Sequence, residues 1–186
     1  MNKQLLRKEL LAKRRALTAE QVALASAGAV KQLLDWPVYK NAQVILAYLA
    51  FGKELNVDGL IVEALRQGKT VAVPLIISPT AFVAAKIEGL EELKLDRYGI
   101  RTVAEPAAII EPAALDLVIV PAVAFGRDGS RMGMGAGYYD RYLPQTGAVT
   151  IGAAYEELLQ DRLPSEAHDV AVDYLVTQTS LCKIRD

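Results

Sequence analysis

Apolar residues recur along the chain with two different periods, and these periods alternate. Near the start, Leu6, Leu10 and Leu17 fall on one side of a helical wheel, because residues four and seven positions apart return to nearly the same angle. From residue 44 onward, continuous runs of valine, isoleucine and leucine have the length of buried strands. Helices that alternate with continuous apolar strands predict an α/β fold with a mainly parallel sheet covered on both faces.

Two helices are expected before the first strand. Asn2 can cap the first helix, over residues 3–16, through its side-chain oxygen. Thr18-Ala-Glu-Gln21 is a capping box that opens a second helix, which is expected to end at Trp36-Pro37. The sequence therefore predicts an N-terminal helical segment ahead of the sheet.

The rest of the chain is predicted to alternate between strands and helices. Helices are expected over residues 60–67, where Gly68 is the stop signal, and over residues 138–143. Residues 90–95 are at most a helical turn, and residues 97–112 read as irregular. Strands are expected over residues 44–49, 70–77, 82–87, 117–125, 149–154 and 172–177.

Composition limits the classes of protein to which the chain can belong. The 186 residues suit one domain, expected over residues 1–186, and 52% hydrophobic with 23% charged residues is ordinary for a soluble enzyme. A net charge of −1 argues against a nucleic-acid partner, and no apolar run reaches membrane-spanning length. The N-terminus lacks the apolar core of a secretory signal, and the single Cys182 excludes an internal disulfide. We expect a cytoplasmic protein with no membrane contact and no obligate protein partner.

The most specific chemistry lies in residues 131–140, which read Arg-Met-Gly-Met-Gly-Ala-Gly-Tyr-Tyr-Asp. Gly133, Gly135 and Gly137 allow a backbone on which a ligand can lie against peptide N–H groups. The loop has neither the Gly-Lys-Ser/Thr ending of a P-loop nor the spacing of a dinucleotide fingerprint. Two interpretations stay open, a phosphate-binding loop and a glycine-rich turn that only lets two elements pack closely.

Other polar residues are candidates because of their place relative to strands, where ligands gather in open α/β sheets. Asp140 and Asp173 suit Mg²⁺, which takes few protein oxygens and the rest from phosphate and water, although each alone is typical of a cap or turn. Lys3, Arg7 and Arg14 form a cationic stripe on the first helix, for which the wheel alone favours a solvated edge.

His168 is the only histidine, and no Gly-x-Ser-x-Gly motif accompanies it. A lone histidine lacks the partners of a hydrolytic triad, so a loop residue is the favoured interpretation. Cys182 has no basic partner near it in the sequence and is expected to be inert.

The run from Val120 to Leu143 resembles the signature of the 5-formyltetrahydrofolate cyclo-ligase family, also called methenyltetrahydrofolate synthetases. Further matching residues fall in the family's order along nearly the whole chain: Lys3 and Arg7, Lys53-Glu54, Tyr98-Gly-Ile100, Leu163-Pro164, His168-Asp169 and Asp173. The resemblance implies a three-layer α/β/α domain. It also implies ATP- and Mg²⁺-dependent conversion of 5-formyltetrahydrofolate to 5,10-methenyltetrahydrofolate, with release of ADP and phosphate.

The same resemblance implies roles for individual residues. Lys3, Arg7 and Arg131 match the cations of the catalytic site, and Asp140 and Asp173 match the Mg²⁺ positions. ATP contacts are implied at Lys3, Gln4, Leu5, Leu6, Arg7, Arg131, Met132, Gly133, Met134, Gly135, Ala136, Gly137, Tyr138 and Tyr139. Folate contacts are implied at Leu49, Glu54, Tyr98, Met134, Gly135, Ala136, Gly137 and Tyr138.

Two other functions are compatible with an α/β scaffold. A non-catalytic module that senses a nucleotide or a sugar phosphate would bind its ligand without turnover, and usually carries a DNA-binding segment. A sugar-phosphate isomerase needs a positioned acid/base pair and no ATP, which leaves the two aspartates and the basic helix unexplained. ATP-dependent turnover of a folate separates all three functions.

Overall fold

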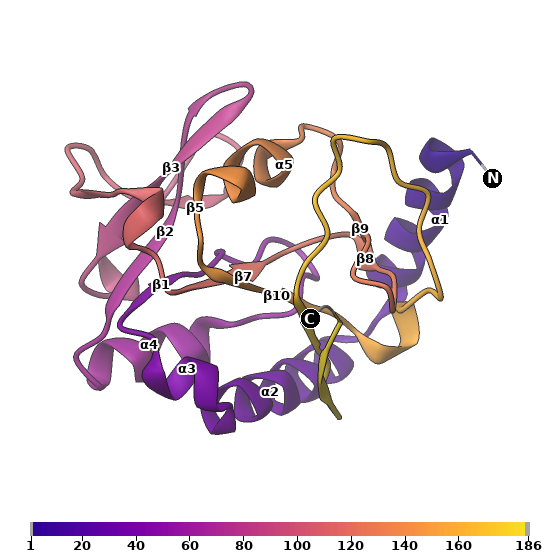
Figure 1. The fold of residues 1–186 in the computed structure, drawn as a ribbon, viewed down its shortest axis with the longest axis horizontal. Coiled ribbons are helices and arrows are strands. Elements are labelled where there is room, and N and C mark those ends of the chain that lie inside the picture. Colours follow the sequence, from indigo (N-terminus) through magenta and orange to yellow (C-terminus); the bar gives the residue numbers. More distant parts are fainter. Residues whose placement is uncertain (1, 185–186) are drawn as a thin grey trace.

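An eight-stranded sheet forms the centre of the protein, as a computed structural model over residues 2–184 describes it (Figure 1). The strands lie in the order β12 (Leu181–Lys183), β11 (Tyr174–Val176), β10 (Val149–Ala153), β7 (Leu117–Val120), β1 (Val44–Leu46), β2 (Thr70–Ser78), β3 (Ala81–Ile87) and β6 (Ile109–Ile110). The five central strands β11, β10, β7, β1 and β2 are all parallel to one another. At the edges, β12 pairs antiparallel with β11, β3 with β2, and β6 with β3. The predicted α/β class with a mainly parallel sheet is confirmed.

Helices cover both faces of this sheet, so the expected three-layer arrangement is also confirmed (Figure 1). On one face lie α2 (Ala19–Asp35), α3 (Pro37–Asn41) and α4 (Asp58–Arg66), whose apolar sides pack on the strands. On the other lies α5 (Tyr138–Tyr142), which buries Tyr142 against Phe82 of β3. The first helix, α1 (Lys3–Ala16), lies at the end of the sheet beside β8 and β9.

The capping residues act as the sequence predicts. The Asn2 side chain accepts a hydrogen bond from the Gln4 backbone N–H at the start of α1. Thr18 and Gln21 form both hydrogen bonds of a capping box at the start of α2. Gly68, just beyond α4, has φ of +76°, a conformation that favours glycine over residues with a Cβ.

The predicted strand over residues 117–125 is two separate strands. Strand β7 ends at Val120, because Pro121 has no N–H to donate to a neighbouring strand. After a short gap, β8 (Ala124–Phe125) pairs with β9 (Arg131–Met132) as a small hairpin outside the main sheet. This hairpin leads directly into the glycine loop.

The remaining elements are short. The irregular region contains another two-stranded ladder, of β4 (Lys94–Leu95) and β5 (Arg101–Thr102), and β12 was not expected at all. Single turns of 3₁₀ helix lie at Leu90–Glu92, Pro112–Ala114, Leu143–Gln145 and Glu156–Leu158. Strands of two or three residues show no sequence period, so only their pairing partners define them. Within residues 2–184, no helix is long and apolar enough to cross a membrane.

The connections around β1 and β7 create the position of the site. From β1 the chain passes through α4 to β2, on one side, whereas from β7 it proceeds to β10, on the other. The two loops therefore separate at the carboxyl ends of two adjacent parallel strands. Such a topological switch point is where open α/β sheets bind their ligands.

Candidate active site

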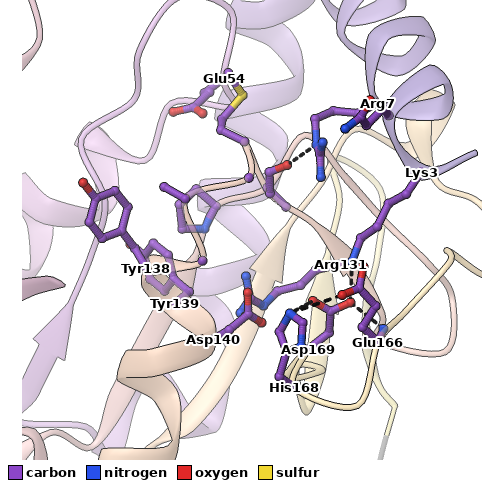
Figure 2. Close-up of a pocket in the computed structure, with 18 of the residues that line it drawn as sticks. Lys3, Arg7, Glu54, Arg131, Tyr138, Tyr139, Asp140, Glu166, His168 and Asp169 are labelled. Carbon is purple, nitrogen blue, oxygen red and sulfur yellow. Dashed lines mark hydrogen bonds and ion pairs between the residues drawn. The ribbon is translucent and has the colours of Figure 1, made fainter. Parts of the chain in front are cut away.

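A pocket of about 640 Å³ lies at this switch point, and its size suits a drug-sized or nucleotide-sized ligand (Figure 2). The loop after β1 contributes Glu54, and Pro121 follows β7. Nineteen site residues were predicted from the sequence and the family resemblance, in the glycine loop, on α1, and at Leu49, Glu54, Tyr98, Asp140 and Asp173. Thirteen of them line the pocket: Lys3, Gln4, Arg7, Glu54, Arg131, Gly133, Met134, Gly135, Ala136, Gly137, Tyr138, Tyr139 and Asp140.

Two cations of α1 face the pocket. Lys3 Nζ lies 2.6 Å from Asp169 Oδ2 and 3.4 Å from Glu166 Oε1. Arg7 Nε donates a hydrogen bond of 2.8 Å to the carbonyl of Gly133 in the glycine loop (Figure 2). The solvated edge favoured by the helical wheel is therefore wrong for Lys3 and Arg7, because α1 turns this face toward the loop.

The glycine loop adopts backbone conformations that require glycine. Gly135 has φ of +105° and Gly137 has φ of +66°, in the region that residues with a Cβ rarely occupy. A Cβ on Gly135 would lie 3.8 Å from the Arg7 guanidinium. The loop forms a wall of the pocket, which favours ligand binding over the interpretation as a packing turn.

Arg131 and Asp140 form a buried ion pair at the base of the loop. Arg131 Nη2 donates to Asp140 Oδ1 at 2.5 Å, and its Nε donates to the Val170 carbonyl at 2.8 Å. The Val170 N–H donates to the same Asp140 oxygen at 3.0 Å. Burial lowers the pKa of Arg131 while Asp140 opposes that shift, and an arginine stays charged in either case. The pair joins the glycine loop to the segment that carries Asp169.

Glu54 lies on the other side of the pocket from Asp169 and His168 (Figure 2). Its Oε2 accepts a hydrogen bond of 3.1 Å from the Phe51 N–H, and its Oε1 lies 3.6 Å from Arg14 Nη1. Burial raises the pKa of Glu54, and the Phe51 N–H and the Arg14 charge oppose that rise. A half-desolvated carboxylate of this kind binds a hydrogen-bond donor of a ligand strongly.

Tyr139 places a polar group in the wall without a protein partner. Its hydroxyl is buried and has no hydrogen-bond partner among the described residues. The ring lies beneath the Arg131 guanidinium, with 5.9 Å between the guanidinium carbon and the ring centroid. A buried hydroxyl without a partner costs free energy, so this group is a cost to the fold beside the pocket.

Five predicted contact residues lie outside the pocket lining. Leu5 is exposed, while Leu6 and Met132 are buried together in the apolar cluster beneath α1. Leu49 packs against the main core, and Tyr98 is 67% exposed on a turn. Within the loop and on the helix, neighbouring side chains point in different directions, so a contiguous run of residues cannot all face one ligand.

Asp173 is not brought into the pocket with Asp140. It precedes β11, at the amino end of that strand, and its Oδ2 accepts hydrogen bonds from the N–H and the hydroxyl of Thr150, at 2.9 and 2.7 Å. Residues 2–184 contain no cluster of three or more His, Cys, Asp or Glu side chains suited to a metal. The predicted pair of aspartates around one Mg²⁺ is therefore not formed by the protein in this structure.

Asp140 alone still fits a Mg²⁺ that takes its other ligands from phosphate and water. The hydrogen bonds from Arg131 and Val170 both go to Oδ1, so among the described residues Oδ2 accepts none. The aspartate lines the pocket wall beside the glycine loop. One carboxylate oxygen of Asp140 thus accepts no hydrogen bond from the described residues, at a position in the pocket lining.

Several contacts within the site were not predicted. Glu166 and Asp169 form ion pairs with Lys3, and Arg14 forms one with Glu54. In each pair the two residues are at least 40 positions apart along the chain. The basic stripe on the first helix indicated cations, but their acidic partners depend on the tertiary fold. His168 is 71% exposed and lies 3.6 Å from Glu166, so it is a loop residue at the rim of the pocket.

Comparisons with known proteins agree on one family. The chain matches the 5-formyltetrahydrofolate cyclo-ligase family over residues 1–178. It is 30% identical to the 5-formyltetrahydrofolate cyclo-ligase of Escherichia coli K12 over 178 residues, which cover 91% of this chain and 96% of that one. The mouse 5-formyltetrahydrofolate cyclo-ligase is 28% identical over 190 residues, covering 94% of this chain and 93% of the mouse chain.

A solved structure extends this similarity to three dimensions. The 5,10-methenyltetrahydrofolate synthetase of Aquifex aeolicus, solved by NMR, aligns with a TM-score of 0.88 and 31% identity, covering 100% of this chain and 94% of that chain. The fold and the switch-point pocket define an open α/β protein built to bind a ligand between α1 and the glycine loop. Within that class, the chain belongs to the 5-formyltetrahydrofolate cyclo-ligase family.

Proposed function

We propose that the protein converts 5-formyltetrahydrofolate to 5,10-methenyltetrahydrofolate, with conversion of ATP to ADP and phosphate and a requirement for Mg²⁺. One observation carries the proposal: the switch-point pocket joins the cations of α1, the glycine loop and Glu54 in one cavity. The relatives named above carry the name of this activity, and they match this chain over almost its full length.

The reaction needs an activated formyl group. The N5-formyl group is an amide, so it is a poor electrophile and its oxygen is a poor leaving group. The formyl oxygen attacks the γ-phosphorus of ATP, ADP leaves, and an N5-iminium phosphate results. N10 of the folate then attacks the activated carbon, N10 loses its proton, and phosphate departs with the former formyl oxygen to leave the methenyl bridge.

The protein's part in such a transfer is to position the substrates and stabilise charge. Lys3, Arg7 and the glycine loop line the part of the pocket where we expect the triphosphate to bind. Glu54, on the opposite side, would accept hydrogen bonds from the pterin and so orient the formyl oxygen toward ATP. We assign no general base, because N10 is nucleophilic without one.

Asp140 is the residue that we expect to hold Mg²⁺, through Oδ2. When bound there, the ion would neutralise charge on the phosphates. Arg131, which holds the other oxygen of Asp140, fixes the direction of that carboxylate. Asp173, the other Mg²⁺ position that the family resemblance implies, accepts hydrogen bonds from Thr150 and does not line the pocket.

The test of the proposal is a spectrophotometric assay of the purified protein. Methenyltetrahydrofolate is followed by its ultraviolet absorbance, with 5-formyltetrahydrofolate and Mg²⁺ present and ATP added or left out. We expect product only when ATP is present, with one ADP formed per product. Folate binding without turnover would instead support a sensing module, and turnover of a sugar phosphate without ATP would support an isomerase.

A further inference from the structure

Arg14 is a buried cation near the C-terminal end of α1. Its side chain is only 10% exposed, and its Nη1 donates a hydrogen bond of 3.1 Å to the carbonyl of Ala122, directly after β7. The same nitrogen lies 3.6 Å from Glu54 Oε1. Burial of an arginine is costly unless a carboxylate and hydrogen bonds compensate it, so the position needs Glu54 as a partner.

The loop that carries Glu54 is joined to α1 a second time. Lys53 Nζ donates to the carbonyl of Leu17, the C-cap residue of α1, while the Tyr155 hydroxyl donates to the Lys53 carbonyl at 3.1 Å. Glu54 itself has one oxygen on the Phe51 N–H and the other toward Arg14. The direction of this carboxylate is therefore defined by α1 as well as by its own loop.

The positive charge of Arg14 also lowers the pKa of Glu54, against the rise that burial causes. The phenols of Tyr48, Tyr139 and Tyr155 lie close enough to Glu54 for its negative charge to raise their pKa. Burial raises the pKa of each of these phenols, that of Tyr155 to about 12, so all are neutral at pH 7. Among the described groups, Arg14 thus supplies the positive charge that favours ionised Glu54.

We propose that Arg14 is a positioning residue for the folate substrate, which acts by holding Glu54 in direction and in its ionised form. The inference rests on the proposed function, because Glu54 is taken there as a folate contact. One helix would then serve both substrates. Arg7 lies two turns, or about 10 Å, before Arg14 on α1 and faces the glycine loop, where ATP is expected.

The test compares substitutions along this one helix. In Arg14→Gln we expect the KM for 5-formyltetrahydrofolate to rise about tenfold. This is the size expected when the folate loses one hydrogen bond to the charged Glu54. The KM for ATP should stay within about twofold of the wild-type value, because α1 and Arg7 remain in place. In Arg7→Ala we expect the opposite result, with a raised KM for ATP and a nearly unchanged KM for 5-formyltetrahydrofolate. Arg15→Gln is the matched control, because Arg15 is exposed on the same helix.

A double substitution separates positioning from a general effect on the fold. If Arg14 acts through Glu54, then Arg14→Gln adds nothing to the folate KM of Glu54→Gln. The pH profile gives a second readout. Loss of the Arg14 charge raises the pKa of Glu54 further, so the acid limb of kcat/KM for folate moves to higher pH in Arg14→Gln.

Each outcome decides one question. Wild-type protein without ATP-dependent product overturns the proposed function. Wild-type activity with an unchanged folate KM in Arg14→Gln, or with independent effects in the double variant, overturns only the role of Arg14. If Arg14→Gln does not fold, Arg14→Lys replaces it. That variant keeps the charge but loses the planar fork, and we expect about a threefold rise in folate KM. A rise in ATP KM as large as that for folate overturns the inference.

Discussion

Charged side chains around the pocket differ in how much of their bonding capacity the protein itself uses. Arg131 donates hydrogen bonds from Nε to the Val170 carbonyl and from Nη2 to Asp140, and its side chain is 4% exposed. Arg7 uses Nε on Gly133, and its guanidinium lies beside Gly135 at the open loop. Of the cations taken from the family resemblance, we therefore expect Arg7 to bind phosphate and Arg131 to orient Asp140.

The two predicted Mg²⁺ aspartates can be separated by matched substitutions. Asp140→Asn keeps an oxygen for Arg131 and Val170 but removes the charge, so we expect turnover to fall by about tenfold or more, with a higher Mg²⁺ concentration at half-maximal rate. Asp173→Asn keeps an acceptor for Thr150, and we expect a wild-type Mg²⁺ requirement with a loss of about 1 kcal/mol in the free energy of unfolding.

Titration of Mg²⁺ in the activity assay, together with urea unfolding, measures both effects. A wild-type Mg²⁺ requirement in Asp140→Asn would remove this residue from the metal site. A shifted requirement in Asp173→Asn would restore the pair that the family resemblance implied.

At the scale of elements, the glycine loop is defined by backbone geometry more than by side chains. Gly135 has φ of +105°, so Gly135→Ala forces a strained conformation costing about 1–2 kcal/mol. In a chain of this size, we expect Tm to fall by about 2–8 °C. Gly133 has no positive φ and open space at its Cβ position, so the control Gly133→Ala should keep or slightly raise Tm. Equal losses in both variants would contradict a special role of Gly135.

Helix α1 is held to the segment before β11 by a pH-dependent contact. Burial alone would raise the pKa of Asp169, but the hydrogen bonds from Lys3 and the Glu166 N–H and the Lys3 charge lower it overall. A carboxyl whose pKa is lowered in the folded state stabilises it above the unfolded pKa, about 4, and that contribution is lost as pH falls through the folded pKa.

We therefore expect Asp169→Asn to weaken the protection of α1 amides against hydrogen exchange at pH 7. At a pH below the folded pKa of Asp169, wild type and Asp169→Asn should unfold at the same urea concentration, because the wild-type carboxyl is then protonated. The control is Glu9→Gln, an exposed carboxylate on the outer side of α1 that pairs only with Lys13 among the described residues. A difference between wild type and Asp169→Asn that persists at low pH would exclude the charge as its cause.

At the scale of the whole molecule, the pocket joins segments from both ends of the chain. Its walls come from α1, the loop after β1, the glycine loop after β9 and the segment of residues 166–169. A ligand that contacts all four walls holds the tertiary arrangement together, because it binds the folded chain and not the unfolded one.

A non-hydrolysable ATP analogue with Mg²⁺, at about 100 times its Kd, should stabilise the folded protein by about 2.7 kcal/mol. For a chain of this length we expect Tm to rise by about 5–11 °C in differential scanning fluorimetry. Removal of Mg²⁺ with EDTA should abolish most of the shift, and Arg7→Ala should reduce it. A shift that survives both changes would place the nucleotide elsewhere on the protein.

The sequence by itself determined those features that depend on neighbours along the chain. The caps at Asn2 and Thr18, the stop at Gly68, the long apolar strands and the alternation of helix and strand were all readable, because hydrogen bonds within four residues and a repeated period produce them. The glycine loop with its flanking Arg131 and Asp140 was readable for the same reason, since these residues lie within ten positions of each other.

Only the tertiary structure decided which distant residues meet. Folding placed Lys3 against Asp169 and Arg14 against Glu54, and it turned Lys3 and Arg7 toward a pocket and not toward solvent. It also placed Asp173 on Thr150 and not beside Asp140. Such contacts depend on the order of strands in the sheet and the angle at which a helix crosses it. Those are set by the packing of the whole core, which no local period in the sequence records.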